Sequence, residues 1–136
     1  MMWVEFKGNR IKPRTVEKFA LSVLNHYFKR EFKRDIEVTI RFVKELDDCT
    51  SGYCHEMEPD HYLVEVARGG TWPGEGYVEY EWQHQMETLA HELVHVKQYI
   101  RKQYGDWEWD LPHSKRPSEI EAFKFQRPLY EQYYGV

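Results

Sequence analysis

The sequence has few of the features that mark secreted or membrane proteins. Among 136 residues there are only two cysteines, Cys49 and Cys54, too few for the disulfide framework of a small secreted protein. No apolar run approaches the roughly 20 residues that cross a bilayer, and the N-terminal stretch MMWVEFKGNR lacks the apolar core of a signal peptide. We therefore expect a protein of the cytoplasm, with no membrane contact and two free thiols.

The chain also contains no internal repeat, no low-complexity tract and no linker-like stretch. Hydrophobic residues make up 41% and aromatic residues 16%, which argues against intrinsic disorder. A chain of 136 residues can bury one sizeable core but is short for two. We expect a single domain over residues 1–136.

Charge is distributed unevenly along the chain, although the net charge is only −4. Residues 1–44 carry eleven Lys or Arg against five Asp or Glu, whereas residues 45–136 carry eight against eighteen. The acidic part suits a cation site, and the basic part could face an anionic partner such as nucleic acid. A solvated helix face is the favoured interpretation of the basic run at residues 29–34, because no nucleic-acid-binding motif accompanies it.

The hydrophobic pattern predicts a helix followed by strands in the first half of the chain. Apolar residues recur at helical spacing from Pro13 to about Phe32, and residues 36–43 and 61–68 alternate as strands do. We expect a turn or short hairpin between those strands, then a loop over residues 69–76 and a short edge strand after it.

Two further helices are predicted in the second half, from about Glu81 to Gln103 and from about Ser118 to Tyr133, the latter kinked by Pro128. The complete order of elements is typical of a small α+β domain with an antiparallel or mixed sheet.

The segment TLAHELVHVKQYI, residues 88–100, carries the motif H-E-x-x-H. At about 100° per residue, His91 and His95 lie almost opposite the apolar stripe of their helix. Residues four apart stack one turn apart, so both imidazoles can reach one Zn²⁺ at about 2.0–2.1 Å. Glu92 would lie beside the metal without binding it, where a general base is needed. The stripe comprises Trp82, Met86, Leu89, Leu93, Val96 and Ile100.

A catalytic zinc site needs a third protein ligand. The metzincin spacing is absent, because VKQYIR follows His95 where that pattern requires a third histidine. Glu119 and Glu121 point about 160° apart on the last predicted helix, so only one of them can face the site. Asp106 and His113 in the preceding loop stay open as ligands. Glu121 has an alternative role as the glutamate of an S-x-x-E capping box with Ser118.

The H-E-x-x-H helix followed by Glu121-Ala122 resembles the gluzincin branch of zinc metallopeptidases, to which thermolysin belongs. With 25 residues between His95 and Glu121, the chain looks most like the minimal SprT-like and phage-type metallopeptidases. The resemblance covers about half of the chain. It implies a minimal zincin-like domain in which His91, His95 and Glu121 bind Zn²⁺ and Glu92 is the general base.

The resemblance further implies hydrolysis of a peptide or protein substrate, with an oxyanion donor among Tyr99, Tyr104, His113 and Tyr130. The alternative is a non-catalytic, zinc-stabilised, protease-like domain that binds a partner such as nucleic acid through its basic N-terminal half. A third interpretation places a structural zinc ion on Cys49, Cys54, His55 and His61, but the adjacent Cys54 and His55 could hardly reach one ion.

Overall fold

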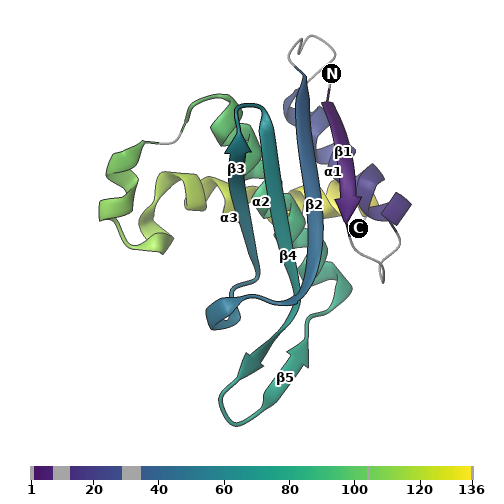
Figure 1. Cartoon of the computed structure of the whole chain (residues 1–136), viewed down its shortest axis with the longest axis vertical. Coiled ribbons are helices and arrows are strands. Elements are labelled where there is room, and N and C mark those ends of the chain that lie inside the picture. Colours follow the sequence, from purple (N-terminus) through teal and green to yellow (C-terminus); the bar gives the residue numbers. More distant parts are fainter. Residues whose placement is uncertain (1, 8–12, 29–34, 104, 136) are drawn as a thin grey trace.

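The computed structural model describes residues 2–7, 13–28, 35–103 and 105–135, which form an α+β fold, as predicted (Figure 1). A sheet of five strands lies beside three helices, and short 3₁₀ turns connect several of these elements. The elements are β1 (Met2–Lys7), α1 (Pro13–Tyr27), β2 (Ile36–Glu45), η1 (Asp47–Cys49), β3 (Gly52–Glu58), β4 (His61–Trp72), β5 (Gly76–Glu79), α2 (Trp82–Ile100), η2 (Asp106–Asp110), η3 (His113–Lys115) and α3 (Pro117–Tyr134).

The sheet is mixed, with strand order β1-β2-β4-β3. β1, β2 and β4 run parallel to one another, whereas β3 runs antiparallel to β4 and forms one edge of the sheet. β5 also pairs with β4, but with its last residues, Gly69 to Trp72. The edge strand β3 contacts α2, and this contact positions the candidate site described below.

The hydrophobic core fills the space between the sheet and the helices. Alternate residues of β4, Tyr62, Val64 and Val66, are buried, as the period of two in a strand requires. The apolar stripe predicted on α2 also packs into this core, except that Trp82 at the start of the helix is 36% exposed. The described residues include no helix that is long and apolar enough to cross a membrane.

The polar face of α2 is buried as well, because α3 packs against this helix. His91 and His95 are only 7% and 5% exposed, and Gln98, on the same face, is 2% exposed. A solvated helix face is therefore excluded as the explanation of the two histidines. Buried polar groups require hydrogen-bond partners, so side chains of α3 and the neighbouring loops must provide partners for the polar side chains on this face.

Two predictions for the strand region were wrong. The segment between the two predicted strands, expected to be a turn or a short hairpin, contains a whole strand, β3, which pairs antiparallel with β4. Residues 69–76 are not a loop, because β4 continues to Trp72 and β5 begins at Gly76. Gly69 indicated a loop in the sequence, but in the structure its missing side chain lets β5 approach β4 closely. A Cβ at this position would collide with the Val78 carbonyl and the Tyr77 ring. Only residues 73–75 form the connecting turn.

The ends of the outer helices also differ from expectation. α1 ends at Tyr27, and the predicted extension to Phe32, like the basic run at residues 29–34, lies outside the described residues. α3 begins at Pro117, so Ser118 is inside the helix and the predicted capping box does not form. Instead, the Ser118 backbone N–H donates to Glu108 Oε1 at 2.8 Å. The strand β1 was not predicted from the sequence, and α3 continues through Pro128.

The packing of the sheet predicts different costs for two valine truncations. Val64 in β4 is fully buried and Val78 in β5 is 39% exposed. We expect Val64→Ala to lower the free energy of unfolding by about 2 kcal/mol, through lost apolar burial and a residual cavity. Val78→Ala should change it by less than about 0.5 kcal/mol. Urea unfolding followed by circular dichroism measures both; equal losses would contradict the assigned orientation of β4.

Candidate metal centre

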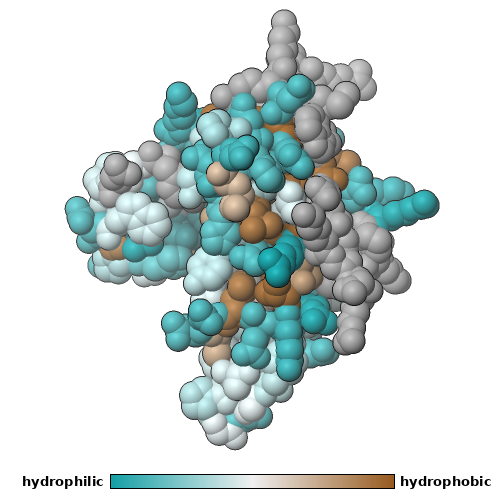
Figure 2. All heavy atoms as spheres, in the orientation of Figure 1, coloured by the Kyte–Doolittle hydropathy of each residue, from teal (hydrophilic) through white to brown (hydrophobic). Residues whose placement is uncertain are grey.

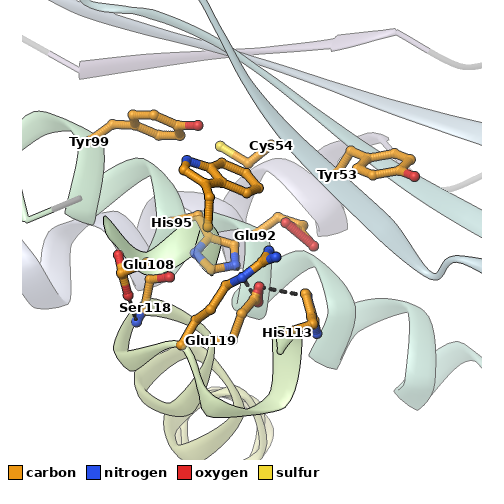
Figure 3. A pocket seen from close by; sticks show the side chains of 11 residues that line it. Tyr53, Cys54, Glu92, His95, Tyr99, Glu108, His113, Ser118 and Glu119 are labelled. Atoms are coloured by element: carbon orange, nitrogen blue, oxygen red, sulfur yellow. Dashed lines mark hydrogen bonds and ion pairs between the residues drawn. The ribbon is translucent and has the colours of Figure 1, made fainter. Parts of the chain in front are cut away.

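Two histidines of α2 and one glutamate of α3 converge on a single point. Glu119 Oε1 lies 2.8 Å from His91 Nε2 and 2.8 Å from His95 Nε2. The His91, Glu92 and His95 ligand atoms all lie within 4.8 Å of one another, which makes them a group that could hold a metal ion. Figure 3 shows His95, Glu92 and Glu119 side by side in a pocket of about 150 Å³.

The orientation of the His95 ring is determined by Gln98. The amide nitrogen of Gln98 donates to Ser118 O at 2.9 Å and to Glu121 Oε1 at 2.8 Å, so its carbonyl oxygen must face His95. His95 Nδ1–H therefore donates to Gln98 Oε1 at 2.7 Å. With the proton fixed on Nδ1, the lone pair of Nε2 is directed at the convergence point.

His91 has a corresponding contact from α3, where Gln126 Oε1 lies 2.9 Å from His91 Nδ1. Both rings thus present Nε2 to Glu119 Oε1. Two neutral imidazole nitrogens and an ionised carboxylate oxygen repel one another unless a cation or a proton lies between them. The arrangement is therefore complementary to a positive charge.

The donor set suits zinc in chemistry and size. Two imidazole nitrogens and one carboxylate are a ligand set found in catalytic zinc sites. Donor atoms at about 2.0–2.1 Å from a tetrahedral zinc ion are about 3.3 Å from one another. The observed separations of 2.8 Å from Glu119 Oε1 to each Nε2 are slightly shorter. A movement of about half an ångström would therefore be enough to accept the ion.

The pKa values of these groups reflect their burial and mutual contacts. Burial disfavours ionised Glu119, but hydrogen bonds with His91 and His95 outweigh it and hold the pKa of this carboxyl well below its usual range. Burial also opposes protonation of His95, yet its contact with Glu119 and the charge of Glu92 raise the pKa of the ring overall. Burial raises the pKa of Glu92, although the two histidines act against this.

Glu121, the predicted third ligand, lies on a different side of α3. Its Oε1 accepts hydrogen bonds from Lys97 Nζ at 2.7 Å and from Gln98 Nε2 at 2.8 Å. Burial is outweighed by these bonds, so the pKa of Glu121 is also lowered. The geometry thus favours Glu119 over Glu121 as the third ligand, since Glu119 Oε1 contacts the two histidines whereas Glu121 Oε1 contacts Lys97 and Gln98. Glu121 instead orients the partner of His95.

Of the other candidates, His113 lies nearest to the convergence point, with Nε2 2.9 Å from Glu119 Oε2. Tyr99 also lines the pocket, whereas Tyr130 packs against Phe19 and Tyr134. Tyr104 and the side chain of Asp106 lie outside the described residues. Gln126 was not predicted from the sequence; the pattern that could have indicated it is its position one helical turn after Ala122, on the face of α3 that meets α2.

The structural zinc site considered on the two cysteines and two histidines does not assemble. Cys49 Sγ donates to Thr71 O, His55 contacts Glu65, and His61 contacts Thr39. Within the described part of the chain, the metal-competent group is the one on α2. Cys54 faces the pocket, where burial and the nearby Glu92 and Glu56 carboxylates raise the pKa of its thiol.

Comparisons of the chain with protein-family models, with curated proteins and with solved structures find no match. Functional inference therefore depends on the geometry of this centre.

The two glutamates of α3 give a direct test of the ligand set. We expect about one zinc ion per chain, and Glu119→Gln should weaken zinc binding by more than about 100-fold because a charged ligand is lost. Glu121→Gln, the matched control on the same helix, should weaken it by about tenfold at most. Competition titration with a chromophoric chelator measures both. The reverse order of effects would contradict the assignment of Glu119.

Zinc binding should also depend on pH through His95. The raised pKa of this ring means that a proton competes with the metal from above pH 6.5 downward. The zinc affinity should therefore decrease by about tenfold per pH unit once the pH is below that pKa. Glu119, whose pKa is lowered, stays ionised over the same range. An affinity that is constant from pH 7.5 to 5.5 would contradict this account.

Proposed function

We propose that the protein is a zinc-dependent peptide hydrolase similar to the gluzincin metallopeptidases, with His91, His95 and Glu119 as the metal ligands. The convergence of two imidazole nitrogens and one carboxylate oxygen at 2.8 Å supports this proposal most strongly. Three protein ligands leave a fourth position open for catalysis, and here they lie at the side of a pocket. A bound zinc ion would polarise the scissile carbonyl and lower the pKa of a water molecule toward about 7.

Glu92 is assigned as the general base. It is 5% exposed and lines the pocket beside His95, so it can reach a water molecule placed between itself and the ligands. Its raised pKa makes it a better proton acceptor than an exposed carboxylate, while the neighbouring histidines favour its ionised form. Glu92 would take the proton of the attacking water and deliver it to the nitrogen of the leaving amine.

The position of β3 supports a peptide as the substrate. Gly52 brings this edge strand against the catalytic carboxylate: a Cβ there would lie 3.0 Å from Glu92 Oε2 and 2.7 Å from Thr88 Cγ2. Tyr53 and Cys54, the next two residues, line the pocket. The backbone of an edge strand can hydrogen-bond an extended peptide and align it along the cleft. A peptide bound in this way would pass directly over Glu92.

The tetrahedral oxyanion needs a donor as well. Among the residues considered from the sequence, Tyr99 and His113 line the pocket. His113 is the better placed, because its ring nitrogen is 2.9 Å from Glu119 Oε2, beside the proposed ligands, and its side chain is 60% exposed, which makes it accessible to a substrate. The alternative, a non-catalytic, zinc-stabilised, protease-like domain that binds a partner through its basic N-terminal half, stays a prediction, because the basic run at residues 29–34 lies outside the described residues.

Substitution of the general base separates catalysis from metal binding. Glu92→Gln should retain zinc and the fold, because Glu92 is not a ligand in the proposed set, but should reduce peptide hydrolysis by about 10²–10⁴-fold. Hydrolysis is measured with casein and a set of quenched fluorescent peptides, and zinc content by atomic absorption. Glu75→Gln, at an exposed glutamate of the turn between β4 and β5, serves as the control and should retain activity. Full activity of zinc-loaded Glu92→Gln would refute the mechanism.

A further inference from the structure

Glu108 in η2 is a buried acid that the proposed mechanism does not use. It is 3% exposed and lines the pocket together with Glu92 and His95 (Figure 3). Its Oε1 accepts a hydrogen bond from the Ser118 backbone N–H at 2.8 Å. Its Oε2 is buried and accepts no hydrogen bond from the residues that the structure describes. The hydrogen bond to the first turn of α3 therefore accounts for Oε1, whereas the described residues provide no partner for Oε2.

An unpaired buried carboxylate oxygen is unfavourable, since buried polar groups are normally hydrogen-bonded. Capping the first turn of α3 does not require such a group, because a serine or asparagine oxygen can accept a backbone N–H equally well. The charge and the second oxygen of Glu108 thus exceed what the fold needs. Because Glu108 lines the pocket, these features indicate that a bound ligand supplies the missing hydrogen-bond donor.

The ligand must donate hydrogen bonds, because an ionised carboxylate only accepts them, and a cation is the strongest donor available. The cation of the pocket itself does not fill this role: Arg116 lies over the Trp109 ring at 4.7 Å and donates through Nε to Leu111 O. No ion pair joins Arg116 to Glu108 within the described part of the chain. The Tyr53 and Tyr99 rings on the pocket wall also favour a positively charged group.

We propose that Glu108 forms an acidic subsite that binds an ammonium or guanidinium group of the substrate beside the scissile bond. This inference rests on the proposed function, since it takes the pocket to be the substrate cleft. The pocket of about 150 Å³ is small compared with sites of about 300–1,000 Å³ that enclose whole ligands. It therefore accepts one side chain or one chain end. The cation comes from a lysine or arginine side chain or from a free N-terminus.

The subsite is tested by peptide binding to zinc-loaded Glu92→Gln, which binds without hydrolysis. Three five-residue peptides on an alanine background serve as probes: an acetylated peptide with a central lysine, the acetylated norleucine counterpart, and the norleucine peptide with a free N-terminus. Calorimetry should show at least tenfold tighter binding of one cationic probe than of the acetylated norleucine peptide. Whichever cationic probe binds more tightly identifies the source of the cation.

Glu108→Gln in the same background is the decisive variant, because its amide oxygen still accepts the Ser118 N–H while the charge is removed. Thermal unfolding checks that the fold is retained. The preference for the cationic probe should disappear in this variant and persist in Glu75→Gln, which removes an exposed acidic charge in the turn between β4 and β5, outside the pocket lining.

The outcomes separate the subsite from the proposed activity. Equal binding of all three probes, no binding of any, or a preference that survives Glu108→Gln would overturn the subsite, whatever the activity of the wild-type protein toward casein. A preference that depends on Glu108, found together with no hydrolysis of any substrate by the wild type, would support the subsite and count against the peptidase proposal.

Discussion

The contact of Glu119 with both histidines determines how the two long helices pack. α2 presents His91 and His95 on the face opposite its apolar stripe, and α3 packs against α2 and helps to bury this face. Burial of two imidazoles and a carboxylate is unfavourable unless they satisfy one another or share a cation. The Glu119 oxygen at 2.8 Å from both rings meets that requirement at the crossing of the helices.

The other polar side chains between α2 and α3 hold the two Nε2 atoms and the Glu119 oxygen in position. Gln98 connects His95 to Glu121, and Lys97, only 3% exposed, neutralises the Glu121 carboxylate. Partners of this kind fix the tautomer and orientation of a metal-binding imidazole and are as much a part of the centre as the ligands. A chain of polar contacts therefore runs from the convergence point through Gln98 to Glu121 and Lys97, between α2 and α3.

The sequence predicted the features that depend on local pattern. The apolar stripe of α2, the i, i+4 histidines and the position of Glu92 followed from helical spacing alone, and the structure places them accordingly. Glu119 was passed over for Glu121 because the choice depends on where α3 begins, and that start is set by Pro117 and a distant carboxylate, Glu108. Gly69 was likewise assigned to a loop because its close contact with a neighbouring strand is a tertiary feature.

The central claim is that His91, His95 and Glu119 bind one zinc ion, and anomalous scattering at the zinc absorption edge from crystals of the zinc-loaded protein tests it most directly. The account predicts one strong peak about 2.0–2.2 Å from both Nε2 atoms and from a carboxylate oxygen of Glu119, with Glu92 outside the coordination shell. A peak coordinated by Glu121, or no peak between the two histidines, would contradict it.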